Sequence, residues 1–414
     1  MEKQPNRIPC ESLDFVEASH RHRVYPLMYC HMEIIGHLDI ERLKQSVSLS
    51  SEIVPEILCA YDFKKNCFVD FGYTADDVVR YTTENMTSAL QQDLDRHPQF
   101  QIFIISQRNH ELVIAVMSHI LADGEGFLQY LYLLAALYNG KRQNKNIENH
   151  RDISPLLKNI HVLAPTEQAK RHKHLSISPL RPAETGNQFL CLTSQISSRD
   201  VELIHQKARV SGATLNDVFM NAYARVIAQL QNINTVVLPC PADLRRFYPE
   251  LDALTIANMA GIYRRITVEI PPGCSFGMTL QQVHGELALQ KSRYRCFVGI
   301  KALDRIFHKA PRLLLEQAIK ATYRLTPVSY TNFGVISHEK LCFTNCTIQN
   351  CFLTGTYRLP PDFQLTISTF KNRCTLNCTL IGGKNDEECG QDEECGQYIL
   401  DRVKNEILNW IEYR

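Results

Sequence analysis

A histidine and an aspartate stand four residues apart in the segment SHILADG, as His119 and Asp123. The apolar run LVIAVM before them predicts a buried strand, and apolar residues at helical spacing over 125–140 predict a helix after them. His119 is therefore expected on a strand-to-helix connection. Histidine can accept a proton near neutral pH, which suits acyl transfer, because a hydroxyl or amine must lose a proton as it attacks a thioester. The alternative is a hydrogen-bonded core histidine.

Asp123 and Gly124 are expected to shape this connection rather than to carry protons. An ionised carboxylate at a strand-to-helix turn is well fixed by an arginine, because the guanidinium group makes charge-assisted hydrogen bonds to it. A glycine in the next position permits a tight turn or a close approach that a Cβ would obstruct. The two residues together predict a loop held in one conformation.

A second polar segment, SYTNFG, is the candidate for the opposite side of the reaction. A thioester carbonyl gains negative charge when it is attacked, so a hydrogen-bond donor is needed facing the base. Thr331 offers a hydroxyl, Asn332 offers an amide, and Gly334 would let the backbone approach a ligand. The alternative is a strand edge followed by a polar turn.

A basic segment separates two halves of the chain. Residues 141–181 contain nine Lys and Arg against three acidic residues. The simplest interpretation is a solvated linker. In the functional alternative, Lys170, Arg171 and Lys173 attract the phosphates of coenzyme A or an acidic carrier protein.

Length and composition indicate an ordinary globular protein of two domains. The 414 residues exceed what one hydrophobic core usually organises, and both halves mix strand and helix patterns, which predicts an α/β (α+β) fold with mixed sheets. We expect lobes at 1–165 and 187–414, joined by a basic linker at 166–186. A net charge of +1 excludes nucleic acid as the expected partner. The absence of a signal peptide or a long apolar run favours a cytoplasmic monomer with reduced cysteines.

The duplication DEECGQDEECGQ (386–397) is acidic and carries one glycine in each copy. Its composition predicts an exposed loop before the last helix. Metal binding by its two cysteines is disfavoured, because no partner pair with zinc-like spacing stands beside them. The pairs Cys342/Cys346 and Cys374/Cys378 fall in strand patterns, where this spacing puts both side chains on one face of a sheet. No metal site is therefore expected.

His119-x-x-x-Asp123-Gly124 after an apolar strand resembles the motif of the chloramphenicol-acetyltransferase-like superfamily, which includes condensation domains and alcohol acetyltransferases. Four further segments are similar in order and spacing to those of its larger, two-lobed members. These segments are GHLDIERLKQSV, GATLNDVFMNAYARVI, PCPADLRRF followed by IANMAG, and SYTNFGVI. Ser118 replaces the second histidine of many relatives, and TNFG stands where the plant enzymes carry DFGWG.

The resemblance implies two acetyltransferase-like lobes with the active site in a channel between them. It also implies that Arg245, at a strand end, pairs with Asp123, with Arg246 as the less favoured neighbour. The expected activity is acyl transfer from a coenzyme A or carrier-protein phosphopantetheine thioester to a hydroxyl or amine, with His119 as general base and no cofactor. The alternatives are a free-standing condensation domain that joins carrier-bound substrates, and an inactive relative that binds a ligand or scaffolds an assembly.

Overall fold

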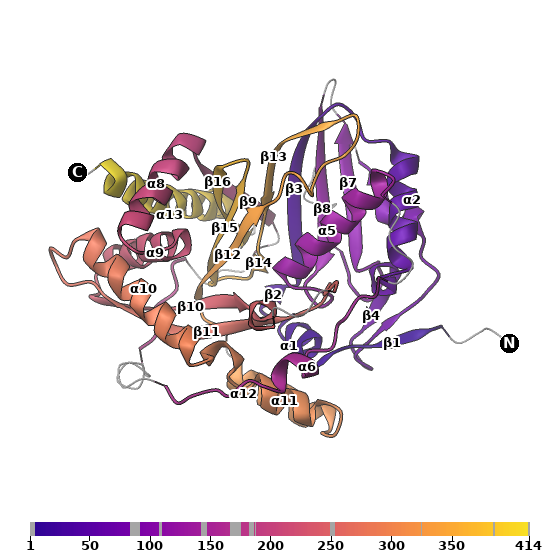
Figure 1. The fold of residues 1–414 in the computed structure, drawn as a ribbon, viewed down its shortest axis with the longest axis horizontal. Coiled ribbons are helices and arrows are strands. Elements are labelled where there is room, and N and C mark those ends of the chain that lie inside the picture. The colour runs from indigo at the N-terminus through magenta and orange to yellow at the C-terminus, as the bar shows by residue number, and fades with distance from the viewer. Residues whose placement is uncertain are drawn as a thin grey trace.

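The computed structural model describes residues 5–82, 92–106, 110–141, 147–165, 175–181, 186, 188–248, 253–323, 325–383 and 386–412. Two lobes lie side by side, each containing a sheet with helices packed against it (Figure 1). The expected mixed α/β architecture with two lobes is confirmed. The expected domain boundaries at 165 and 187 stay predictions.

The N-terminal lobe is built on a five-stranded sheet in the order β13-β3-β8-β7-β6. All neighbours are antiparallel except β6 and β7. Its strands are β3 (Leu27–Ile35), β6 (Val79–Tyr81), β7 (Phe100–Ser106), β8 (His110–Ser118) and β13 (Thr347–Leu353). Helices α2 (Ile40–Ser51) and α5 (Gly124–Tyr138) pack against each other beside this sheet. The shorter elements are β1 (Arg7–Pro9), α1 (Ser12–Ser19), η1 (Pro55–Leu58), β4 (Ala60–Asp62), β5 (Cys67–Val69), α3 (Ala75–Val78) and α6 (Ser154–Leu157).

The C-terminal lobe contains a six-stranded sheet and a separate two-stranded ribbon. The sheet has the order β12-β15-β16-β14-β2, with β9 also paired to β16, and the ribbon is β10-β11. The strands are β2 (Val24–Tyr25), β9 (Gln188–Ile196), β10 (Thr235–Asp243), β11 (Ala260–Glu269), β12 (Val328–Ile336), β14 (Tyr357–Arg358), β15 (Phe363–Phe370) and β16 (Arg373–Gly382). The helices are α8 (Ser198–Val210), α9 (Leu215–Gln231), η2 (Leu244–Phe247), α10 (Phe276–Ser292), η3 (Arg295–Phe297), α11 (Ile300–Phe307), α12 (Arg312–Thr322) and α13 (Asp386–Glu412).

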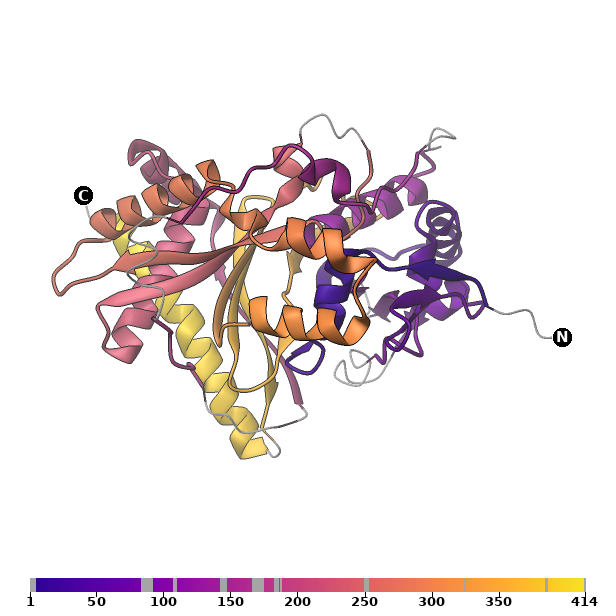
Figure 2. The same ribbon diagram turned by 90° about the horizontal axis from the view of Figure 1, so that it is seen from below.

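The two sheets exchange edge strands. β13, from late in the chain, pairs with β3 in the N-terminal lobe, while β2, from its beginning, pairs with β14 in the C-terminal lobe. Helix α1 likewise lies against α11 and α12, which Figure 2 shows in orange beside the indigo start of the chain. The chain therefore crosses between the lobes more than once.

The strand and helix that flank His119 are confirmed. β8 carries the apolar run and ends at Ser118, and α5 begins at Gly124. α5 ends at Tyr138, two residues before Gly140, whose φ of +74° is a conformation that glycine adopts without strain. Local sequence chemistry thus determines the strand before the connection and the helix after it.

The expected loop at DEECGQDEECGQ is wrong, because the duplication forms the first turns of α13. The helix packs on β9 and β16. A Cβ at Gly396 would lie 2.5 Å from Leu192 Cδ1, so glycine allows the helix to approach the sheet closely. Tertiary packing here outweighs the low helix propensity of glycine.

The expected strand at KLCFTNC is also wrong, and Cys342 and Cys346 therefore lie outside any sheet. The side chain of Asn139, in place of a strand partner, hydrogen-bonds to the backbone of this loop. Its Nδ2 donates to the Cys342 carbonyl at 2.8 Å, and its Oδ1 accepts from the Thr344 N–H at 2.8 Å. Cys374 and Cys378 do lie in β16, and both are buried.

Candidate active site

The backbone of His119 is held at the end of β8. Its N–H donates to the Pro26 carbonyl at 2.9 Å, and the preceding Ser118 N–H donates to the Gln99 carbonyl at 2.8 Å. Its imidazole is 23% exposed, so one part of the ring is open to solvent. The Nδ1 atom is shielded from solvent and has no hydrogen-bond partner in the part of the chain that the structure describes, and the Glu17 carboxylate lies 3.9 Å from it. A fixed backbone thus carries a ring whose polar edge is incompletely satisfied.

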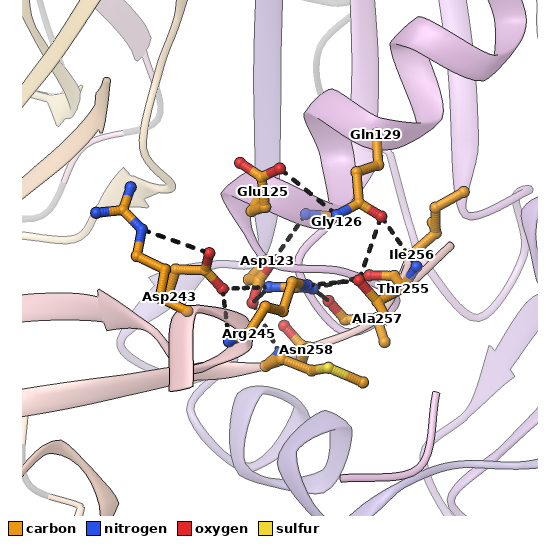
Figure 3. A network of polar contacts seen from close by, with 12 residues as sticks. Asp123, Glu125, Gly126, Gln129, Asp243, Arg245, Thr255, Ile256, Ala257 and Asn258 are labelled. Atoms are coloured by element: carbon orange, nitrogen blue, oxygen red, sulfur yellow. Dashed lines mark hydrogen bonds and ion pairs between the residues drawn. The ribbon is translucent and has the colours of Figure 1, made fainter. Parts of the chain in front are cut away.

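Asp123 forms the N-cap of α5 and connects the two lobes (Figure 3). Its Oδ1 accepts from the Gly126 N–H at 2.8 Å, as an N-cap carboxylate does. Its Oδ2 accepts from Arg245 Nη1 at 3.0 Å and from the Met259 N–H at 2.7 Å. The expected ion pair between Asp123 and Arg245 is therefore present, with both side chains less than a tenth exposed.

Arg245 lies in η2, directly after β10, and also binds Asp243 and the segment that precedes β11. It donates to Asp243 Oδ1 at 3.0 Å, to the Thr255 hydroxyl at 2.7 Å, and to the carbonyls of Thr255 and Ala257 at 2.8 and 3.0 Å. Although burial opposes a charge here, the carboxylates of Asp123 and Asp243 raise the pKa of Arg245 above its usual value. We call Arg245 with Asp123 and Asp243 the Arg245 clamp.

A second buried guanidinium, that of Arg151, holds the other end of the loop. Its Nη2 lies 2.5 Å from Asp14 Oδ2, and its Nη1 donates to the Leu121 and Ile256 carbonyls at 3.0 and 3.2 Å. Glu56 lies 3.4 Å from its Nε. Burial opposes the charge, but the two carboxylates raise the pKa of Arg151 above its usual value.

Asn258 connects this ion pair to the histidine itself. Its Nδ2 lies 3.0 Å from Asp14 Oδ1 and 2.9 Å from each of the His119 and Ile120 carbonyls. We call Asp14, Glu56, Arg151 and Asn258 the Arg151 clamp. Sequence reasoning did not find these residues. The available signals were an aspartate inside the apolar segment SLDFVEAS and the asparagine of IANMAG.

The segment SYTNFG lies on β12 and approaches the loop through an unexpected residue. A Cβ on Gly124 would lie 2.2 Å from Phe333 Cε1, so the ring of Phe333 occupies the space that a side chain at 124 would need. Gly124 thus permits the close approach expected of it. The loop is contacted at this point by an aromatic ring rather than by backbone.

Asn332 and Gly334 are engaged with each other rather than with the His119 loop. Asn332 Nδ2 donates to Asn216 Oδ1 at 3.2 Å, and its Oδ1 accepts from the Gly334 N–H at 2.8 Å. Gly334 has a φ of +73° at an irregularity in the pairing of β12 with β15. Among the described residues, the Thr331 hydroxyl has no hydrogen-bond partner. Thr331 is thus the more available donor of the expected set.

Lys170, Arg171 and Lys173 lie outside the described residues, so their role stays a prediction. Two surface hollows, of about 520 and 310 Å³, lie beside α2 and beside α5, and neither is lined by His119. The channel at His119 likewise stays a prediction. Within the described ranges, no group of three or more His, Cys, Asp and Glu side chains is arranged to hold a metal ion. None of the described helices combines the length and the apolar character needed to cross a bilayer.

Comparison with solved structures identifies the architecture. The chain has the chloramphenicol-acetyltransferase-like fold in its two-lobed, condensation-domain form. No family model matches the sequence, and no curated protein matches it. The fold is therefore recognised from structure at a level of identity where sequence comparison finds nothing.

Three of these structures show how completely the fold is shared. Polyketide synthase associated protein 5 from Mycobacterium tuberculosis has a TM-score of 0.71 at 13% identity, over 99% of this chain and 100% of its own. The condensation domain of the monacolin K polyketide synthase gives 0.67 at 11% identity, over 99% of each chain. The trichothecene 15-O-acetyltransferase of Fusarium sporotrichioides gives 0.66 at 13% identity, over 98% of this chain and 95% of its own.

Proposed function

We propose that the protein is an acyltransferase. It transfers an acyl group from a thioester of coenzyme A, or of the phosphopantetheine of a carrier protein, to the hydroxyl or amine of a small molecule. The observation that carries the proposal is the placement of His119, a partly exposed imidazole on a backbone that two buried arginine clamps hold in place. The similarity in fold to an O-acetyltransferase and to condensation domains supports the reaction class.

In this reaction His119 removes a proton from the acceptor. The acceptor oxygen or nitrogen bonds to the thioester carbonyl carbon while its proton passes to the Nε2 atom of His119. The tetrahedral intermediate carries negative charge on the former carbonyl oxygen, and the Thr331 hydroxyl is the proposed donor to it. The C–S bond then breaks, and the leaving thiolate takes the proton back from the imidazolium. Nothing is oxidised or reduced.

The residues of the Arg245 clamp have a structural role in this proposal. The Asp123 carboxylate accepts from the Gly126 N–H, from Arg245 and from the Met259 N–H, and these contacts fix the loop in place. Lys170, Arg171 and Lys173 are proposed to attract the phosphates of the donor. A condensation domain acting on carrier-bound substrates is the second candidate, because such domains share the fold over almost their full length.

A panel of acyl thioesters tests the proposal. Purified protein is incubated with acyl-coenzyme A esters and with acylated carrier proteins, each with alcohol and amine acceptors, and thiol release is measured. Turnover with free coenzyme A esters supports the first candidate, and turnover only with loaded carriers supports the second. No thiol release above background in any combination would contradict both and favour a ligand-binding or scaffold role.

The His119→Ala variant tests the proposed base. Alanine keeps both backbone hydrogen bonds at this position, so the thermal unfolding temperature should stay close to that of the wild type. The rate of thiol release should fall by about 10²-fold or more, the usual scale for loss of a general base. A folded variant with full activity would exclude His119 from the chemistry.

A further inference from the structure

Helix α1 directs two carboxylates toward the His119 loop. Asp14 and Glu17 are three residues apart and so lie on one face of the helix. Asp14 belongs to the Arg151 clamp and contacts the backbone of the loop through Asn258. The Glu17 carboxylate lies 3.9 Å from His119 Nδ1, and its side chain is 30% exposed. The helix thus reaches both the backbone and the ring of the same histidine.

The Nδ1 atom of His119 has an unmet requirement for a partner. It is shielded from solvent, and none of the described residues makes a hydrogen bond to it. A buried polar atom in this state is costly and calls for a partner. A separation of 3.9 Å is too long for a hydrogen bond, and a change of the Glu17 side-chain rotamer would close it. The Glu17 side chain is 30% exposed and makes no hydrogen bond in the described chain, so it is free to make that movement.

A buried cation interacts with the charge of Glu17. Arg358, on β14, is 8% exposed, and its buried Nε has no hydrogen-bond partner among the described residues. Burial lowers the pKa of Arg358 to about 10, while the charges of Asp362 and Glu17 oppose this. Asp362 is already bound by both oxygens to Arg23, at 2.9 and 2.8 Å. The opposite charges of Arg358 and Glu17 therefore attract each other.

We propose that Glu17 is the positioning residue of His119, an inference that rests on the acyltransferase function proposed above. Its carboxylate accepts a hydrogen bond from the N–H of Nδ1, which leaves the lone pair of Nε2 free to receive the acceptor's proton. When Nε2 is protonated, the imidazolium faces an ionised carboxylate that stabilises it. Glu17 acts only through the ring and does not touch the reacting atoms.

Two variants of Glu17 separate charge from hydrogen bonding. Glu17→Met removes both the charge and the acceptor at similar volume, whereas Glu17→Gln keeps an acceptor oxygen and removes the charge. Glu41→Gln is the matched control, because Glu41 is 81% exposed on α2 and its recorded ion pair is with Lys44, one turn away. All three variants should remain folded, and Glu41→Gln should keep wild-type activity.

The ¹⁵N chemical shifts of the His119 ring report which nitrogen carries the proton, and this measurement needs no substrate. The wild type should hold the proton on Nδ1, and Glu17→Met should move it toward Nε2. In the acyl-transfer assay kcat should fall about tenfold in Glu17→Gln and about 10²-fold in Glu17→Met, with KM within about twofold of the wild type. A smaller loss in Glu17→Gln than in Glu17→Met would show that the retained acceptor oxygen preserves part of the positioning.

The two readouts distinguish failure of this inference from failure of the proposed function. If Glu17→Met leaves the His119 proton on Nδ1, the pairing with Glu17 is wrong, whatever the activity. If the wild type shows no turnover but Glu17→Met still moves the proton, the pairing stands and the acyltransferase function fails. Equal losses of kcat in Glu17→Met and in the Glu41→Gln control would also overturn the positioning role.

Discussion

The Arg245 clamp and the Arg151 clamp hold the same loop but bind different parts of it. Arg245 binds the carboxylate of Asp123 at the start of α5 and connects the loop to the ribbon of the second lobe. The Arg151 clamp binds the backbone carbonyls of His119 and of the two residues after it. The first therefore fixes where the loop ends, whereas the second fixes the residue that is proposed to do the chemistry.

Both clamps bind one segment, residues 255–259, that lies between η2 and β11. Arg245 binds the carbonyls of Thr255 and Ala257, and Arg151 binds the carbonyl of Ile256 between them. One short segment thus accepts hydrogen bonds from both buried guanidinium groups. A substitution in one clamp should thus also weaken the other, although the free energy of unfolding and kcat should change in different proportions.

The largest loss of stability is expected at the Arg245 clamp, where one guanidinium makes five hydrogen bonds. Arg245→Met should lower the free energy of unfolding by about 3 to 5 kcal/mol, because it leaves the Asp123 carboxylate buried without its counter-charge. The double variant with Asp123→Asn should cost less than the sum of the two single changes. Urea denaturation measures both quantities.

Arg246→Met is the matched control for this cycle. The Arg246 side chain is 80% exposed, so its replacement should change the free energy of unfolding by no more than about 0.5 kcal/mol. Equal losses in Arg245→Met and Arg246→Met would contradict the structural role of the clamp. A stable Asp123→Asn variant with a large loss of rate would instead make Asp123 a participant in the chemistry.

A somewhat smaller loss of stability, but a larger loss of rate, is expected at the Arg151 clamp. Arg151→Met should lower the free energy of unfolding by about 3 kcal/mol, since the Asp14 carboxylate loses its buried partner. Arg151 also binds the Leu121 carbonyl directly, and its partner Asp14 orients the Asn258 amide that binds the His119 carbonyl. Because these contacts are weakened as well, kcat should fall further than in Arg245→Met at a temperature where both are folded. Steady-state kinetics beside denaturation curves compare the two variants. A rate equal to that of Arg245→Met would remove the distinction between the clamps.

The smallest effect is expected from a change inside the loop itself. Gly124→Ala should lower the free energy of unfolding by about 1 to 2 kcal/mol, because the new Cβ overlaps the ring of Phe333. Adding Phe333→Leu should restore part of the loss by making room. Gly277→Ala, on α10, is the control, since its Cβ meets nothing within 4 Å and alanine is the better helix former. A similar cost for both glycine replacements would exclude contact with Phe333 as the cause.

Sequence reasoning predicted the parts of the site that depend on local order. His119, Asp123 and Gly124 are adjacent to a strand and a helix with clear periodicity, so their place at a strand-to-helix connection followed directly. The Arg151 clamp was out of reach, because residues 14, 56, 151 and 258 come from four separate places and none stands in a repeating pattern. Their proximity is a product of the tertiary fold alone.

The errors in the fold have the same origin. The glycines of DEECGQDEECGQ indicate a loop when read locally, yet α13 needs one of them to approach β16. The segment KLCFTNC has strand-forming residues, but a single asparagine side chain on the far end of α5 satisfies its backbone. In both cases the deciding contact is with a residue more than ten positions away, which composition and periodicity do not report.

The exchange of β13 into the first sheet has a consequence for synthesis of the protein. During translation, β3 emerges more than 300 residues before its edge partner, so its outer row of backbone groups waits unpaired while the second lobe is made. A chain that stops at residue 186 would carry the whole His119 motif and still expose that edge. The nascent first lobe is therefore expected to need a chaperone until the C-terminal third has left the ribosome. The late synthesis of β13 thus raises the risk of aggregation during translation.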